Sequence, residues 1–278
     1  MNRRRFLRRA SCAVLGLGLA GAADALVVEP RWVAVERRDV PIRGLGAGLD
    51  GLRVVLLSDT HCGPWTSPAY VRKAVRLANE QEPHVALLLG DYCHDHRRHI
   101  GPGIEPFADL EAAHGVFAVL GNHDHWEDAQ ATRQALKDVG AVELTNTAAV
   151  IERRGDRLAI GGVDDLWTGQ QDPVTAFAAA GEGVPRLLLS HNPDYAEELP
   201  EGLRVDLMVS GHTHGGQVWL PLVGAPLVPS GYGQRYRAGL VEGPRCPVYV
   251  TRGLGTITPP VRFLCRPELT GLTLRRQR

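Results

Sequence analysis

The chain has 278 residues, of which 44% are hydrophobic and 22% charged, and its formal net charge is zero. This composition provides a sizeable core for one large domain and excludes a largely disordered chain. The first nine residues carry five arginines and no acidic group, so the remainder has a surplus of five acidic groups. A protein that coats nucleic acid needs a basic surface, so we expect no stable nucleic-acid partner.

Residues 1–25 have the layout of an export signal. A basic start precedes an apolar stretch over 13–20 and small residues over 20–25. The opening Arg3, Arg4, Arg5, Phe6 and Leu7 resembles the twin-arginine pattern of paired arginines, any residue, then Phe-Leu. We therefore predict that the twin-arginine export machinery carries the folded protein across a bacterial inner membrane, to the periplasm or the outer membrane face. The alternative is an uncleaved segment that keeps the protein on the membrane.

Residues 26–278 are expected to form a single domain, because no Pro/Gly/Ser-rich linker separates two cores. In the first half, apolar runs that suit buried strands alternate with helical patterns, which is typical of a sheet covered by helices. The expected strands are 53–58, 84–90 and 115–120, and the expected helices are 68–80, 105–112 and 126–139.

From residue 141 the apolar runs become shorter and lie closer together, which indicates a second, mixed sheet. The runs are 142–144, 149–151, 158–160, 218–220, 248–250 and 272–274. Two facing mixed sheets with helices outside would form a four-layer α/β/β/α sandwich.

Five short segments with metal-ligand side chains each begin where an apolar run ends. They are Ser-Asp-Thr-His at 58–61, Gly-Asp at 90–91, Gly-Asn-His-Asp at 121–124, Ser-His at 190–191 and Gly-His-Thr-His at 211–214. Ligands of open α/β sheets bind beyond the carboxyl ends of the strands, so these segments can meet in one pocket.

The residue types in these segments suit a centre of two metals, which needs a bridging carboxylate, terminal His and Asp or Asn ligands, and open positions. Asp59 and His61 lie two apart past a strand end, where strand alternation would turn both side chains to one side. His212 and His214 repeat that spacing. Nitrogen and oxygen ligands without thiolate favour transition metals over calcium. We expect two divalent metal ions, and Mn, Zn, Fe and Mg all stay open.

In this order, the segments resemble the motifs of the calcineurin-like metallophosphoesterase superfamily, from about residue 50 to the end of the chain. Further motifs are similar to the bacterial exported branch of YaeI-like and YkuE-like phosphodiesterases; they lie at 211–217, 231–232, 251–255 and 265–268. The resemblance implies a metal-dependent phosphodiesterase, a phosphoric ester hydrolase.

The resemblance also implies which residue holds which metal. One metal would take Asp59, His61, Asp91 and His214, and the other Asp91, Asn122, His191 and His212. Asp91 would bridge them, and a bridging water with a lowered pKa would attack phosphorus in line.

Two catalytic roles follow from the same resemblance. His123 would steady the phosphoryl oxygens or protonate the leaving group, and Asp124 is a candidate orienting partner. The chain departs from the family at His94, where many relatives carry aspartate. For His94, His96, His99 and His125 we favour a polar loop over extra metal ligation. Asp164, Asp165 and Trp167 would either line the cleft or form a plain turn.

The loop at 219–236 is a candidate substrate loop, because Trp219, Tyr232, Tyr236, Arg235 and Arg237 gather in or beside it. An arginine there could bind phosphate and an aromatic ring a base, sugar or acyl chain; a rigid surface loop is the alternative.

An exported enzyme would act on small-molecule or lipid-linked phosphodiesters or pyrophosphates of the envelope. The alternatives are a UDP-2,3-diacylglucosamine-type pyrophosphatase at the membrane and a non-catalytic metal-binding scaffold. We expect a monomer, with membrane-surface association left open.

Overall fold

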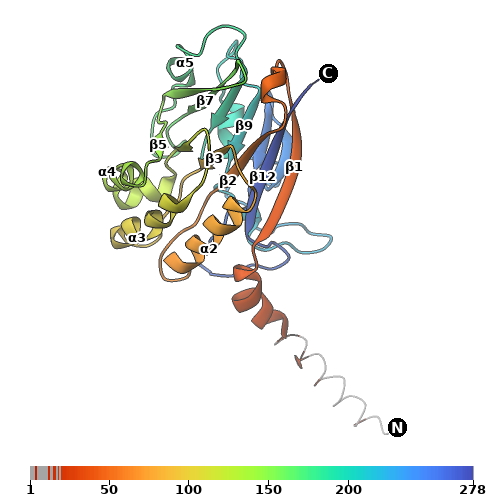
Figure 1. The fold of residues 1–278 in the computed structure, drawn as a ribbon. Coiled ribbons are helices and arrows are strands. Elements are labelled where there is room, and N and C mark those ends of the chain that lie inside the picture. The colour runs from red at the N-terminus through yellow and green to blue at the C-terminus, as the bar shows by residue number, and fades with distance from the viewer. Residues whose placement is uncertain (1–3, 5–11, 13–14, 17, 19, 278) are drawn as a thin grey trace.

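The computed structural model describes residues 4, 12, 15, 16, 18 and 20–277 (Figure 1). Most of the predicted export signal, 1–25, lies outside the described residues. Where the description becomes continuous, the chain passes through two short helical turns, η1 (Asp24–Val28) and η2 (Glu29–Arg31), before it enters the body of the protein. Within the described part of the chain, no helix is both long enough and apolar enough to cross a membrane.

The first sheet has six strands in the order β1-β12-β2-β3-β4-β5. Neighbours run parallel except β12 and β2, which are antiparallel. The strands are β1 (Ala34–Ile42), β12 (Glu268–Arg276), β2 (Leu52–Leu57), β3 (Val85–Leu88), β4 (Val116–Ala118) and β5 (Val142–Glu143).

The second sheet also has six strands, in the order β10-β11-β9-β8-β7-β6. Its four central strands are parallel, and each edge strand is antiparallel to its neighbour. The strands are β10 (Gly239–Glu242), β11 (Pro247–Val250), β9 (Leu207–Ser210), β8 (Arg186–Leu189), β7 (Asp156–Gly162) and β6 (Ala148–Arg153).

The sequence assigned some strands to the wrong sheet. The runs at 142–144 and 272–274 became β5 and β12, which pair within the first sheet. The run at 218–220 forms only isolated bridges, from Val218 to Phe263 and from Leu220 to Gly224. An apolar run shows that a strand is favourable but does not select its neighbour, and pairing between distant strands decides the sheet.

Helices of the first half cover the outer face of the first sheet (Figure 1). The predicted helix at 68–80 is α2 (Pro68–Asn79), which begins after Ser67, whose hydroxyl accepts a hydrogen bond from the Tyr70 N–H. The helix predicted at 126–139 starts earlier, as α4 (Asn122–Asp138).

The helix predicted at 105–112 is only partly correct. A short α3 (Ile100–Ile104) runs into the 3-10 turn η5 (Glu105–Asp109), where the chain leaves helical conformation. The second sheet is covered by shorter elements, α5 (Pro173–Ala176) and η6 (Pro193–Glu197). The remaining helical turns are η3 (Ala47–Leu49), η4 (Arg97–His99) and η7 (His214–Gly216).

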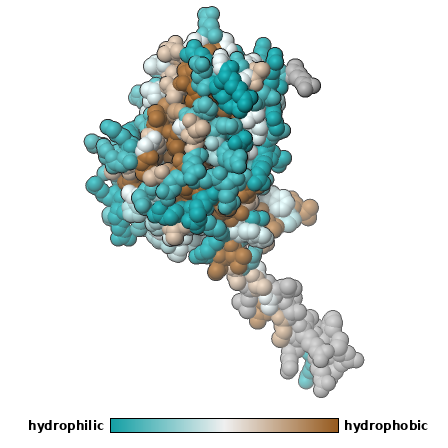
Figure 2. Space-filling view, viewed as in Figure 1, coloured by the Kyte–Doolittle hydropathy of each residue, from teal (hydrophilic) through white to brown (hydrophobic). Residues whose placement is uncertain are grey.

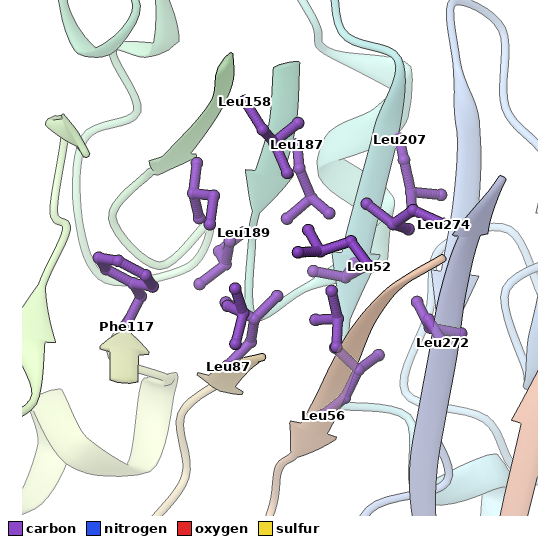
Figure 3. Packing of buried hydrophobic residues seen from close by; sticks show 14 of the residues in the cluster. Leu52, Leu56, Leu87, Phe117, Leu158, Leu187, Leu189, Leu207, Leu272 and Leu274 are labelled. Atoms are coloured by element: carbon purple, nitrogen blue, oxygen red, sulfur yellow. The ribbon is translucent and has the colours of Figure 1, made fainter. Parts of the chain in front are cut away.

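The main hydrophobic core lies between the two sheets (Figure 3). Leu52 and Leu87 of the first sheet pack toward Leu158, Leu187 and Leu207 of the second. Burying each leucine stabilises the fold by about 1.5–3 kcal/mol. From the outside, hydrophilic side chains cover much of the body (Figure 2). The four-layer arrangement that the sequence predicted is confirmed, and it aligns the carboxyl ends of β2, β3, β8 and β9 along one edge.

Candidate metal centre

All seven predicted metal ligands are buried at this edge of the two sheets, and none of these residues is more than 5% exposed. They come from the segments that follow β2, β3, β8 and β9 and from the first residue of α4. The seven are Asp59, His61, Asp91, Asn122, His191, His212 and His214. Buried polar side chains need hydrogen-bond or metal partners, so a cluster of seven indicates a binding site.

Five of these ligands have left-handed backbone. The φ angles are 52° at Asp59, 43° at His61, 57° at Asp91, 67° at His212 and 52° at His214. Non-glycine residues rarely adopt this conformation, and it costs about 1–3 kcal/mol at each position. The chain thus turns sharply at each strand end, and this turn, rather than the strand alternation that the sequence suggested, aims the paired side chains inward. Such strain is concentrated at functional sites.

One ligand group contains Asp59, His61 and His214. The Nε2 atoms of the two histidines face each other at 3.0 Å. His214 Nε2 lies 3.4 Å from Asp59 Oδ1, and His61 Nε2 lies 4.0 Å from the same oxygen. Two facing imidazole nitrogens can share one proton or bind one cation together, and nitrogens bound to one metal lie about 3 Å apart. This group therefore fits a metal ion.

A second group contains Asp91, His191 and His212. His212 Nδ1 and His191 Nε2 face each other at 3.2 Å, and His191 Nε2 also lies 3.2 Å from Asp91 Oδ2. The same carboxylate oxygen is 3.5 Å from His61 Nε2 of the first group. Asp91 thus stands between the groups, in the place of a bridging ligand.

Asn122 completes the donor set. Its Oδ1 atom is buried and has no hydrogen-bond partner among the described residues. An unpaired buried acceptor costs about 1–3 kcal/mol, which a cation would offset. The site thus offers nitrogen and oxygen donors in two adjoining groups that fit two divalent cations.

Burial keeps three of the imidazoles in the form that binds metals. Removal from water lowers the pKa of His61 and His214 well below the usual value and lowers that of His212 to about 3. Burial also raises the pKa of Asp59 to about 6. Metal ligation needs neutral imidazole and ionised carboxylate, so these three histidines are already in the form that binds metal, and a nearby cation would favour the ionised form of Asp59.

Hydrogen bonds from the surrounding chain hold the ligands in place. His191 Nδ1 lies 2.7 Å from the carbonyl oxygen of Leu89, which fixes the ring so that Nε2 points to Asp91. The Asp59 carboxylate accepts hydrogen bonds from the His212 N–H at 3.0 and 3.1 Å. The His123 N–H donates to Asp91 Oδ1 at 2.9 Å.

Asp124 has a different role from the orienting partner of His123 that the sequence suggested. Its buried carboxylate accepts hydrogen bonds from the backbone N–H groups of Asp91 at 2.7 Å, Tyr92 at 3.0 Å and Gly121 at 2.9 Å. These contacts fix the two ligand loops after β3 and β4 to each other. In the described structure Asp124 thus positions the Asp91 backbone rather than orienting the ring of His123.

Gly121 is packed against the bridging position. A Cβ atom at residue 121 would lie 2.3 Å from Asp91 Oδ1 and 2.8 Å from the ring of His191. Contacts this short require the ligands to move, because neither side chain is free to retreat within the buried centre.

We expect Gly121→Ala to weaken metal binding by about 10-fold to 100-fold, the usual effect of disturbing what supports a metal ligand. Metal content after dialysis against a graded series of chelator concentrations measures this. Gly101→Ala is the matched control, since a Cβ there meets nothing within 4 Å. Equal metal retention by the two variants would contradict the close packing at Gly121.

His123 and His94 lie beside the first group. The His123 ring is 4.7 Å from that of His61 and 5.2 Å from that of His94, measured between centroids. His94, for which we favoured a polar loop, thus lies beside the centre, and its ligand atom is within 4.8 Å of those of His61 and His123. His96 is exposed and His99 is half-buried.

The other candidate residues divide into two sets. Tyr236 of the predicted substrate loop is buried, and Arg235 pairs with Glu197 of η6 at 2.6 Å, so both attach the loop to the body of the protein. His125 and Asp164 instead form a hydrogen bond of 2.8 Å beside the centre. This bond raises the pKa of His125.

The sequence reasoning missed Trp126. Its ring contacts that of His123, with a centroid distance of 4.8 Å. The signal was available, since residues three apart on a helix are neighbours and α4 begins at the ligand Asn122. Trp167 lies in a similar place on the other side, 4.4 Å from the ring of His212. For Trp167 the geometry therefore favours the prediction that it lines the cleft over the prediction of a plain turn.

Two solved structures have the same fold. They are the Haemophilus influenzae NAD nucleotidase NadN, with 17% identity, and a 5'-nucleotidase precursor from Thermus thermophilus, with 18%. Each has a TM-score of 0.50, over 73% and 81% of this chain. The matches span 45% and 54% of those longer chains, about half of each.

Sequence relatives cover the whole chain. Phosphodiesterase YaeI of Escherichia coli (strain K12) is 34% identical over 99% of both chains. The uncharacterized metallophosphoesterase YkuE of Bacillus subtilis (strain 168) is 29% identical over 99% of this chain and 98% of its own. The model of the calcineurin-like phosphoesterase family matches residues 52–216, which hold all seven ligands. The chain therefore belongs to the calcineurin-like phosphoesterase family.

Proposed function

We propose that this protein is a two-metal phosphodiesterase that hydrolyses phosphodiester or pyrophosphate bonds in molecules of the bacterial envelope. The observation that carries the reaction class is the pair of adjoining ligand groups, with Asp91 of the second group lying 3.5 Å from His61 of the first. The name of the YaeI relative supports the choice of diester over monoester. When bound, two divalent cations would acidify a water molecule and neutralise charge on the phosphoryl oxygens.

The protein's own residues would orient the substrate and supply a proton. His123 is only partly buried, and its ring lies against His61 at the border of the centre. An imidazole in this place can donate a proton to the leaving oxygen or a hydrogen bond to the phosphoryl group. The carboxylates of Asp124 and Asp59 hold the ligand loops in place through the hydrogen bonds that they accept from backbone N–H groups.

Hydrolysis of two artificial esters tests the reaction class. Protein stripped of metal and reloaded with Mn, Zn, Fe or Mg should cleave bis-p-nitrophenyl phosphate faster than p-nitrophenyl phosphate, and the stripped protein should cleave neither. The metal that restores the highest rate would identify the preferred cofactor. No diester cleavage with metal bound would instead favour a non-catalytic metal-binding scaffold.

The envelope substrate rests on the twin-arginine pattern at Arg3 and Arg4. We expect Arg3→Lys/Arg4→Lys protein to remain in the cytoplasm, because the export machinery reads the arginine pair. Cell fractionation followed by immunoblotting measures this, with Arg8→Lys/Arg9→Lys as the matched control. Undiminished export of the first variant would contradict the twin-arginine proposal. Cytoplasmic retention of the unmodified chain would favour the UDP-2,3-diacylglucosamine-type pyrophosphatase on the inner membrane face.

A further inference from the structure

Two exposed tryptophans face each other beside the metal centre. Trp126 is 57% exposed and Trp167 is 52% exposed. Their ring centroids are 6.4 Å apart, and the ring planes differ by 27°. These two large apolar rings are about half exposed to solvent beside the polar metal centre. They therefore present flat faces to an incoming ligand.

Each tryptophan also contacts a residue of the centre. Trp126 meets His123 edge to face at 4.8 Å, and Trp167 meets the ligand His212 in the same way at 4.4 Å. The pair therefore connects the proposed proton donor to the second ligand group. A group held by these rings would be one arm of a substrate whose phosphorus lies at the metals.

The chain holds this pair in position through partly buried hydrogen bonds. Trp126 lies on α4, directly after His125, whose Nε2 is 2.8 Å from Asp164 Oδ1 in the loop after β7. In that loop, Asp165 Oδ2 accepts hydrogen bonds from the N–H groups of Trp167 and Thr168, both at 3.0 Å. Asp165 is fully buried. The bond between His125 and Asp164 thus ties the two tryptophan-bearing segments together, which reduces the ordering cost of binding.

We propose that Trp126 and Trp167 form a stacking subsite for a nucleobase carried on one arm of the phosphodiester or pyrophosphate. This inference rests on the proposed function and narrows its substrate class to nucleotide-linked small molecules. Nearly parallel indole faces select a flat heteroaromatic ring, and such stacking tolerates different bases. The acidic surplus of the body disfavours a polynucleotide, so a single nucleotide unit is the occupant.

Two matched esters test the subsite in the full, metal-loaded chain. One is the p-nitrophenyl ester of thymidine 5'-phosphate, and the other is the same ester of 1,2-dideoxyribose 5-phosphate, which lacks the base. The unmodified protein should prefer the base-bearing ester by about tenfold in kcat/KM, which is the typical contribution of one stacked base. This preference should fall toward one in Trp126→Ala and in Trp167→Ala, and should largely persist in the phenylalanine variants.

Trp32→Ala is the matched control, since Trp32 is also exposed but packs on Arg266, 3.9 Å from its ring. It should keep the full preference. A ratio near one in the unmodified protein, or an unchanged ratio in both alanine variants, would overturn the nucleobase subsite while leaving the phosphodiesterase intact. Lower rates on both esters at an unchanged ratio would show that the rings hold the p-nitrophenyl group, which also overturns it.

Binding without turnover separates this inference from the proposed function. Thymidine 5'-monophosphate should quench the tryptophan fluorescence of the metal-loaded protein, and 2-deoxyribose 5-phosphate should not. The Trp126→Phe/Trp167→Phe double variant should lose the quenched component. Quenching of this kind without cleavage of either ester would overturn the proposed reaction and retain the subsite. Equal quenching by the two ligands, or full quenching of the double variant, would overturn the subsite.

Discussion

Replacing Asp91 with asparagine is expected to lower metal-dependent kcat/KM by about a thousandfold or more. One oxygen of Asp91 faces His61 of the first ligand group and His191 of the second, at 3.5 and 3.2 Å. Its other oxygen accepts the hydrogen bond from the His123 N–H. The amide removes the negative charge between two cation positions, and stabilisation by bound metal is worth several kcal/mol, with each 1.4 kcal/mol a factor of ten in rate.

The measurement pairs kinetics on bis-p-nitrophenyl phosphate with metal content by mass spectrometry. We expect the variant to hold fewer than two metal ions for each chain and to keep its fold, since asparagine has the same shape. Asp109→Asn is the matched control, because Asp109 is an exposed aspartate whose partner is Arg72, 3.4 Å away. A variant that keeps both metals and its rate would refute the assignment of Asp91 as the bridge.

The centre was predictable from the sequence because its information is local. Each ligand segment follows a buried apolar run, and parallel strands bring their carboxyl ends to one edge. Asp59, Asp91 and His191 were identified in this way, and all three are buried there. The sequence did not predict the backbone conformation that directs these side chains into the site. Left-handed φ angles at Asp59 and Asp91 arise from the packing of neighbouring loops, and the residue types at these positions do not predict them.

Long-range pairing was the other part that the sequence did not specify. The last strand, β12, inserts between β1 and β2, so residues more than 200 positions apart lie side by side, as Thr270 and Leu56 do. An apolar pattern does not specify which distant strand it pairs with. The same limit applies to Asp124, whose three backbone partners lie on two loops. Proximity in sequence suggested His123 as its partner, whereas the fold supplied nearer ones.

Replacing His123 with alanine is expected to lower kcat by about a hundredfold to ten-thousandfold, the usual contribution of a general acid. Metal content should not change. The backbone N–H of residue 123, and not the imidazole, binds Asp91, and alanine retains that group. His123 is not a member of the two ligand groups that contain Asp59 and Asp91, but its ligand atom lies within 4.8 Å of those of His61 and His94 in a third group. Loss of turnover with metal retained would therefore distinguish His123 from the ligands.

The leaving group reveals how His123 acts. p-Nitrophenolate departs without a proton, whereas an alkoxide needs one, so a general acid matters far more for an alkyl leaving group. We expect His123→Ala to lose at least about ten times more activity on an alkyl phosphodiester than on bis-p-nitrophenyl phosphate. His114→Ala is the matched control, since His114 precedes β4 at the opposite end from the centre. Equal losses on both esters would instead assign His123 to steadying the phosphoryl oxygens, and unchanged rates on both would remove it from the site.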